Sequence, residues 1–261
     1  MQASPCHEGI CAIGVMAKAP QPGRSKTRLC PPLSHHQAAA LSAAFLRDVT
    51  ENIALAAREA PIAGLIAFAA PGSEALFDGH LADGTGMVLA DGSCPAPDAV
   101  GGFGRCLLHA MRSMLGAGYG AACVLNSDSP TLPTATLVQA ASALLRPGRR
   151  VVLGAAEDGG YYLLGATGAH AHLFADIAWS TDSVAAATRV RAAELGLELV
   201  ELAPWYDVDD RGSLARLLDE TAGHAPPADH QPGAAPYAAR ATAAAIERLG
   251  LRAARLTLAA Q

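Results

Sequence analysis

Short runs of apolar residues alternate along this chain with longer stretches in which apolar side chains recur at helical spacing. The run from Ile10 to Ala17 holds no charged residue, which is typical of a central strand buried on both faces. Similar runs predict strands at residues 62–69, 86–90, 121–126, 150–155, 161–165 and 197–202. Helices are predicted at residues 34–58, 103–115, 134–145, 181–195 and 211–220, and Ser34 is a good N-cap residue for the first.

The alternation of strands and helices predicts the fold class. It is typical of crossover units that build a mostly parallel sheet with helices on both sides, a three-layer α/β/α, Rossmann-like arrangement. Ligands of such sheets bind at the carboxyl ends of the strands, near the point where the strand order reverses. The loops after Ala17, Ala90, Asn126 and Ala155 are therefore the expected site of function.

The end of the chain has a different composition. Residues 223–236 hold four prolines, two glycines and two histidines, which indicates a linker. We expect a nucleotide-binding domain at residues 1–222, a linker at 223–237 and an accessory helix at 238–261. This C-terminal arm would dock on the domain or on a partner subunit, where it would form a homodimer.

Composition limits the classes of partner. Hydrophobic residues make up 51% of the 261 residues and charged residues 16%, so the chain can bury a large core and is not disordered as a whole. A formal net charge of −5 argues against general nucleic-acid binding. The apolar stretches are shorter than the roughly 20 residues of a membrane span, and the N-terminus lacks the pattern of a secretory signal. The six cysteines have no metal-binding spacing, and most lie in apolar contexts, where we expect buried free thiols. We therefore expect a cytoplasmic protein that does not act on membranes.

A basic loop follows the first predicted strand. Four cationic residues occur within eleven positions, and proline and glycine shape the path of the loop. Backbone N–H groups and cationic side chains together suit a polyphosphate, whereas the alternative is a solvated basic loop. We favour phosphate binding because the loop lies at a strand end, although it is not a Walker loop. The candidate residues of this loop are Ala17, Lys18, Pro22, Gly23, Arg24, Lys26 and Arg28.

Polar residues also follow two later predicted strands. Ser127 and Asp128 lie at the end of an apolar strand, where the carboxylate of Asp128 could bind Mg²⁺ or could cap the following turn. Asp158, Gly159 and Gly160 could approach a ligand closely, but their spacing favours an ordinary hairpin turn.

An acidic cluster precedes the helix predicted at residues 211–220. Asp207 and Asp209 are two positions apart, so in an extended segment their side chains face the same way and one could complete a metal site with Asp128. Alternatively these acids form an N-terminal cap for the helix, a role that we expect at least for Asp210.

Taken together, these motifs resemble a bacterial glycosyltransferase-A-like family of uncharacterised transferases. The resemblance runs from about residue 10 to residue 218 and rests on A-K-A-P-x-P-G-x-x-K-T-R-L, S-D-S-P-x-L, D-G-G-Y-Y-L-L-G, W-S-T-x-x-V and W-Y-D-V-D-D. More distantly the chain is similar to phospholactate and molybdenum-cofactor guanylyltransferases. The resemblance implies a nucleotide-diphospho-sugar transferase (glycosyltransferase-A-like) fold.

The resemblance also implies roles for individual residues. Lys18, Arg24, Lys26 and Arg28 would grip the phosphates, with Lys26 and Arg28 acting in catalysis. Asp128 and Asp209 would hold Mg²⁺ or Mn²⁺, and Ser180 and Thr181 would join the substrate site. One departure lies at residues 101–104, where Gly-Gly-Phe-Gly replaces the usual G-D-L-G and lacks its acid.

Three functions compete on this basis. The first is a metal-dependent nucleotidyltransferase, in which a phosphorylated small-molecule acceptor attacks the α-phosphorus of a nucleoside triphosphate and pyrophosphate leaves. The second is a glycosyltransferase with a nucleotide-sugar donor. Four cations suit a triphosphate better, and the strand end at Asp128 lacks the second acid of the D-x-D motif of many glycosyltransferases. The third is a nucleotide-binding module without catalytic activity, which the missing acid and the C-terminal arm favour.

Overall fold

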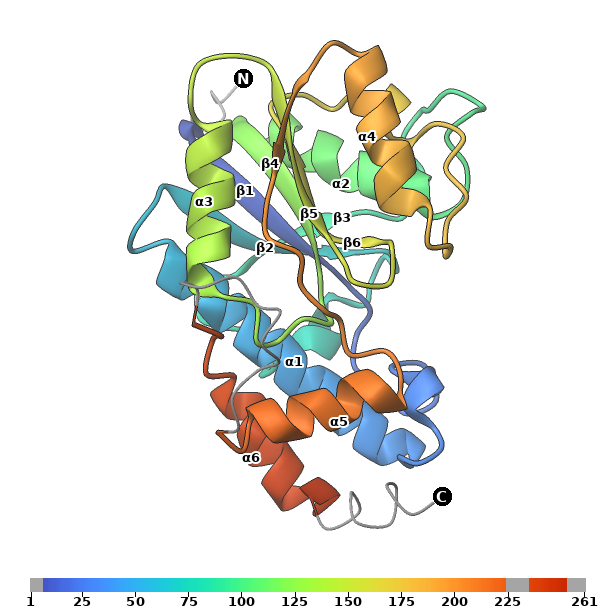
Figure 1. The fold of residues 1–261 in the computed structure, drawn as a ribbon, viewed down its shortest axis with the longest axis vertical. Coiled ribbons are helices and arrows are strands. Elements are labelled where there is room, and N and C mark those ends of the chain that lie inside the picture. Colours follow the sequence, from blue (N-terminus) through green and yellow to red (C-terminus); the bar gives the residue numbers. More distant parts are fainter. Residues whose placement is uncertain (1–6, 224–234, 253–261) are drawn as a thin grey trace.

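The computed structural model describes residues 7–223 and 235–252 of the chain. Within them, seven strands form one sheet in the order β3-β2-β1-β4-β6-β5-β7 (Figure 1). Strand β6 runs antiparallel to both β4 and β5, whereas the other neighbouring pairs are parallel, so the predicted mostly parallel sheet is confirmed. The strands are β1 (His7–Ala17), β2 (Ile62–Phe68), β3 (Gly86–Leu89), β4 (Tyr119–Asn126), β5 (Arg150–Ala155), β6 (Tyr161–Ala166) and β7 (Glu198–Glu201).

Helices cover both faces of the sheet and complete the three layers (Figure 1). One apolar core joins the sheet to α1, α3, α5 and α6, and a second core on the other face joins it to α2 and α4. The α-helices are α1 (His35–Ala56), α2 (Phe103–Gly116), α3 (Thr134–Leu144), α4 (Val184–Glu194), α5 (Arg211–Glu220) and α6 (Arg240–Arg248). The described residues also form three short 3-10 helices, η1 (Thr27–Leu29), η2 (Glu74–Phe77) and η3 (Ala171–Phe174).

The central strands β1 and β4 lie between two apolar cores, which explains why their sequences are apolar without alternation. In β1, Cys11 and Ile13 face the first core, whereas Ala12 between them and the β4 residue Val124 belong to the second. Since both faces are covered, the central residues 11–15 of β1 and 121–125 of β4 are buried. Burial of this apolar surface is the main stabilising contribution to the fold.

Most predicted boundaries agree with the structure to within two residues. The helix predicted from Ser34 is α1, where the Ser34 hydroxyl accepts from the N–H of Gln37 and the Gln37 side chain accepts from the N–H of Ser34. The helix predicted at residues 181–195 begins later, at Val184. Ser180 has a φ of 64°, and the Thr181 hydroxyl bonds to Ala178 O, so this segment is a turn and not a first helical turn.

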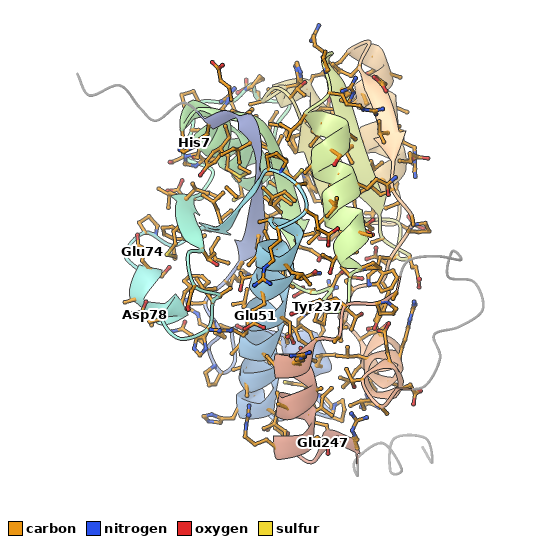
Figure 2. All side chains as sticks on the ribbon, turned by 90° about the vertical axis from the view of Figure 1, so that its left-hand side faces the viewer. His7, Glu51, Glu74, Asp78, Tyr237 and Glu247 are labelled. Carbon is orange, nitrogen blue, oxygen red and sulfur yellow. The ribbon has the colours of Figure 1, made fainter. Side chains whose placement is uncertain are left out.

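Part of the C-terminal arm lies against the domain. Helix α6 packs beside α1 of the same chain, as Figure 2 shows. The buried carboxylate of Asp48, on α1, accepts hydrogen bonds from the N–H groups of Ala241 (3.0 Å) and Thr242 (2.6 Å) in the first turn of α6. Burial raises the pKa of this carboxyl, and the bonds from Thr242 and Ala241 act in the opposite direction.

Other expectations about the arm stay predictions. Most of the linker and the end of the arm lie outside the described residues, and the division into domains and the homodimer are untested. No helix of the described part of the chain combines the length and the apolar character needed to cross a bilayer.

The cysteines correct one expectation. Cys11 and Cys123 are buried, with their sulfur atoms 3.8 Å apart between β1 and β4. Cys30, Cys94 and Cys106 are only partly buried free thiols, because they lie in loops or at the start of a helix near the surface and not inside the sheet.

Candidate functional site

A pocket of about 460 Å³ opens where the carboxyl ends of β1, β2 and β4 meet. It lies at the point where the strand order reverses, because the chain runs outward from β1 through β2 to β3 and then returns to β4 on the other side of β1. The residues that line it are Met16, Ala17, Lys18, Arg24, Ser25, Lys26, Thr27, Arg28, Ser42, Ala67, Ala69, Phe103, Cys106, Ser127, Asp128 and Asp209.

The basic loop after β1 is held in shape by its own hydrogen bonds. Gln21 O accepts from the N–H groups of both Arg24 and Ser25, and the buried Ser25 hydroxyl bonds back to Gln21 N and Ala19 O. Gly23 has a φ of 75°, a conformation that glycine adopts without a steric penalty. The loop is therefore a compact turn that directs successive basic side chains toward different surroundings.

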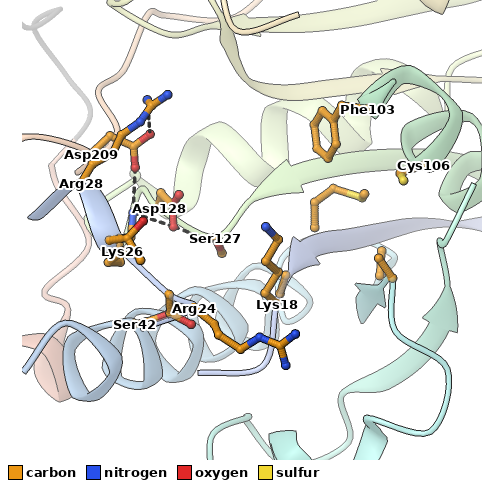
Figure 3. A pocket seen from close by; sticks show the side chains of 16 residues that line it. Lys18, Arg24, Lys26, Arg28, Ser42, Phe103, Cys106, Ser127, Asp128 and Asp209 are labelled. Atoms are coloured by element: carbon orange, nitrogen blue, oxygen red, sulfur yellow. Dashed lines mark hydrogen bonds and ion pairs between the residues drawn. The ribbon is translucent and has the colours of Figure 1, made fainter. Parts of the chain in front are cut away.

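Lys26 is the buried member of the basic loop. Its Nζ lies 2.8 Å from Asp128 Oδ1, 3.0 Å from Asp209 Oδ1 and 2.7 Å from Val208 O, as Figure 3 shows for the two carboxylates. Its side chain is 5% exposed and lies 5.4 Å from the centre of the Phe45 ring. Three acceptors thus match the three N–H donors of the ammonium group.

The other basic side chains are more open to the pocket. The side chain of Arg28 is 76% exposed, and its Nη1 lies 3.9 Å from Asp209 Oδ2. Lys18 and Arg24 line the pocket, and within the described residues neither forms an ion pair with a carboxylate. Figure 3 shows Lys18 between the acidic side of the pocket and the side that carries Phe103 and Cys106.

Asp128 and Asp209 are brought together from distant parts of the sequence. The main-chain oxygen of Asp128 accepts from the N–H of Val208 (2.9 Å), and the Ser129 hydroxyl donates to Tyr206 O (2.9 Å). The Ser127 hydroxyl also donates to the Asp128 carboxylate (2.9 Å). These bonds join the end of β4 to the segment before α5 and place both carboxylates beside Lys26.

The acidic segment divides its roles among three residues. Asp210 caps α5, since its carboxylate accepts from the N–H of Ser213 (2.8 Å), which confirms the expected cap. Asp207 is not among the pocket-lining residues; burial, together with the charges of Asp209, Asp158 and Asp128, raises its pKa to about 6. The charges of the pocket carboxylates Asp128 and Asp209 therefore act on Asp207, although Asp207 itself does not line the pocket.

The glycine turn between β5 and β6 lies outside the pocket lining. Gly159 has a φ of 89°, and a Cβ atom on it would lie 2.1 Å from the main-chain oxygen of Asp182. Gly159 O accepts from the N–H of Ala185, and the Asp158 carboxylate accepts from the N–H of Gly160. The close backbone approach that these glycines allow is therefore to the segment before α4 of the same chain.

The predicted site residues fall into two groups. The pocket lining includes Ala17, Lys18, Arg24, Lys26, Arg28, Ser127, Asp128 and Asp209. It does not include Pro22, Gly23, Asp158, Gly159, Gly160, Ser180 or Thr181. Pocket residues that the sequence did not single out include Ser42 and Cys106, and also Phe103, for which the adjacent pair Gly101-Gly102 at a loop-to-helix junction was an available signal.

The two carboxylates suit a divalent cation in part. Asp128 and Asp209 each place an oxygen within 3.0 Å of one point, the Lys26 nitrogen, so they could reach a common ion. In residues 7–223 and 235–252, no group of three or more His, Cys, Asp or Glu side chains is placed to hold a metal. This donor set fits Mg²⁺ or Mn²⁺ held by two carboxylates, with waters and substrate phosphates as the remaining ligands.

Comparisons with known proteins agree with this fold. Residues 53–181 match a family described as an uncharacterised protein conserved in bacteria (DUF2064), a stretch that includes Asp128 but neither the basic loop nor Asp209. No curated protein matches the chain.

Among solved structures, a proposed nucleotide-diphospho-sugar transferase from Desulfovibrio desulfuricans G20 is similar over 91% of this chain and 97% of that chain, with 23% identity and a TM-score of 0.69. Rv0371c of Mycobacterium tuberculosis H37Rv, in complex with manganese, is 18% identical with a TM-score of 0.43, covering 81% of this chain and 98% of that one. CMP:2-keto-3-deoxy-manno-octonic acid synthetase in complex with CTP is 11% identical, with a TM-score of 0.46 and coverage of 82% and 98%. The first of these structures shows that the chain has the predicted α/β fold of a nucleotide-diphospho-sugar transferase. The likeness to guanylyltransferases stays a prediction.

Proposed function

We propose that this chain is a metal-dependent nucleotidyltransferase, which transfers a nucleoside monophosphate from a nucleoside triphosphate to a small phosphorylated acceptor. The observation that carries the proposal is the composition of the pocket at the β1–β4 switch point. Lys18, Arg24 and Arg28 face it with their charges largely free, and two carboxylates lie beside them. Cations for phosphates and carboxylates for a divalent ion are what a polyphosphate substrate requires.

Each residue of the charged side has a role in this proposal. Lys18, Arg24 and Arg28 bind the triphosphate and stabilise the charge that develops on pyrophosphate as it leaves. Asp128 and Asp209 hold Mg²⁺ or Mn²⁺, which when bound neutralises charge on the phosphate oxygens. An oxygen of the acceptor's phosphate forms the new bond to the α-phosphorus while the bond to pyrophosphate breaks, and the side chains act by position and charge.

The other side of the pocket is suited to an uncharged ring. Phe103 is 50% exposed, and Met16, Ala67 and Ala69 are further apolar residues of the lining. The Phe103 ring is held from behind by Trp179, with ring centres 5.8 Å apart in an edge-to-face arrangement. A nucleobase or a sugar could lie against this surface while its phosphates reach the charged side.

A glycosyltransferase is the second candidate, and the named activity of the D. desulfuricans protein favours it. The donor would be a nucleotide-sugar, and the attacked atom would be its anomeric carbon. Against it, three open cations exceed what a diphosphate needs, and the segment Asn126-Ser127-Asp128 supplies one carboxylate where many glycosyltransferases have two.

Product analysis separates the candidates. Purified protein would be incubated with each nucleoside triphosphate or nucleotide-sugar, Mg²⁺ or Mn²⁺, and a panel of phosphorylated acceptors. Release of pyrophosphate supports nucleotidyl transfer, and release of a nucleoside diphosphate supports glycosyl transfer. Nucleotide binding without either product over the whole panel would support a non-catalytic module and overturn the proposal.

A further inference from the structure

The contacts of Lys26 differ from those of a phosphate-binding lysine waiting for its ligand. All three of its N–H donors have acceptors at 2.7 to 3.0 Å, and two of these acceptors are carboxylate oxygens. Its backbone has a φ of 51°, an uncommon conformation for a residue with a side chain, which persists only where surrounding contacts maintain it. Lys26 is therefore committed to Asp128 and Asp209 when no ligand is present.

We propose that Lys26 is an internal substitute for the divalent cation: its ammonium group balances Asp128 and Asp209 until a metal ion takes these carboxylates. This inference rests on the proposed function. Both carboxylates point an oxygen at one position, which the ammonium nitrogen now occupies, and a metal ion held by the same two oxygens needs that position. Lys26 and the metal ion are therefore competitors.

Displacement gives Lys26 a second role. It lines the pocket together with Lys18 and Arg24, so an ammonium that leaves the carboxylates can turn toward bound phosphates. The pocket then has one more free cation only when metal is bound. Metal binding and nucleotide binding become mutually favourable, because each stabilises the displaced position of Lys26, and such coupling is reciprocal by thermodynamic necessity.

The test measures Mn²⁺ affinity in the absence of nucleotide, by calorimetry and by the electron paramagnetic resonance signal of free Mn²⁺. Lys26→Met removes the competing charge, and we expect it to bind Mn²⁺ at least tenfold more tightly than the wild type. Lys18→Met is the matched control, since it removes the same charge from the same pocket without freeing a carboxylate. We expect this control to change the affinity by less than threefold.

Two results would overturn the role of Lys26. One is unchanged or weaker Mn²⁺ binding by Lys26→Met, and the other is an equal gain in Lys18→Met, which would reflect general charge and not competition. Lys26→Gln, which keeps a donor for Val208 O, serves if Lys26→Met does not fold. The thermal unfolding of Lys26→Gln is then measured with Mn²⁺ and with chelator. If Mn²⁺ stabilises this variant more than it stabilises the wild type, the proposal is supported, and if the stabilisation is equal or smaller, it is overturned.

A second measurement separates this inference from the proposed function. Wild-type protein is titrated with Mn²⁺ in the presence of a non-hydrolysable nucleoside triphosphate analogue. If it binds Mn²⁺ there, while Lys26→Met shows no gain without nucleotide, only the substitute role fails. If it binds no Mn²⁺ even with the analogue, the metal-dependent function fails as well.

Discussion

The loop after β1 and the turn between β5 and β6 both combine glycine with charged residues at a strand end, yet they have different surroundings. The basic loop supplies residues to the pocket, and Arg28 extends into solvent. The glycine turn packs against the backbone at Asp182, and its carboxylate closes the turn on Gly160. A glycine beside charged residues is thus not sufficient to identify a ligand site. Whether such a segment lines the pocket depends on how close its strand lies to the point where the strand order reverses.

This comparison predicts that changes in the turn act on stability and that changes in the loop act on ligand binding. The largest effect is expected for Gly159→Ala. The new Cβ would lie 2.1 Å from Asp182 O on a backbone with a φ of 89°, so we expect a loss of about 3 kcal/mol or more in the free energy of unfolding.

Chemical denaturation of Gly159→Ala measures this loss, with Gly116→Ala as the control. Gly116 is the last residue of α2, and a Cβ on it would meet no atom within 4 Å. Alanine favours a helix, so the control should be as stable as the wild type or slightly more stable. A Gly159→Ala protein of wild-type stability would contradict the packing role of the turn.

A large effect on activity is expected for Asp128→Asn. The amide keeps the size of the side chain but loses the charge that Lys26 and a metal ion require. We expect product formation to fall by about 100-fold or more, as for other groups that stabilise charge during a reaction. Circular dichroism must show a folded protein, and undiminished metal-dependent turnover would rule out Asp128 as a metal ligand.

Arg24→Ala and Lys18→Ala should weaken nucleotide binding with little change in stability. Neither side chain forms an ion pair within the described residues, so its removal leaves no buried charge behind. We expect about a tenfold increase in KM or Kd for each, which corresponds to one lost charge-assisted contact of about 1.4 kcal/mol. Arg58→Ala, an exposed arginine just after α1, is the control that should change neither quantity.

A smaller effect is expected for Phe103→Ala, which tests the apolar side of the pocket. The ring is half exposed, so its loss should lower stability by only about 1 kcal/mol. We expect the Kd for the nucleotide to rise three- to fivefold and the Kd for inorganic pyrophosphate to stay constant, because pyrophosphate has no ring. Val190→Ala, with similar exposure on α4, should change neither constant.

The smallest effect on binding is expected for Asp158→Asn. Asparagine can still accept the hydrogen bond from Gly160, and Asp158 does not line the pocket, so KM should stay within twofold of wild type. Removing this charge should lower the pKa of Asp207 from about 6, because Asp158 is one of the carboxylates that raise it. NMR measurement of the carboxyl resonances during a pH titration would report the change in pKa. A tenfold change in KM would contradict the prediction and indicate that the turn contacts the substrate.

Local sequence patterns were sufficient to predict the helices, the strands and the class of fold. Continuous apolar runs predicted β1, β2 and β4, because the central part of a strand that is covered on both faces carries apolar side chains on both sides. Ser34 and Asp210 predicted two helix starts, since a cap depends on neighbours within the same turn. Because ligands of parallel sheets bind at the carboxyl ends of the strands, the sequence also predicted that the basic loop and Asp128 belong to the site, and both line the pocket.

The surroundings of each charged residue in the pocket depend on contacts between distant segments and could not be predicted from the sequence. Nothing local distinguishes Lys26 from Lys18 or Arg24, and its burial arises because Asp128 and Val208, far away in sequence, are held together by a hydrogen bond. Contacts between distant segments also place Phe103 in the pocket lining and the glycine turn outside it. A side chain's partners depend on which strand ends adjoin in the sheet, and local sequence patterns carry little information about that order.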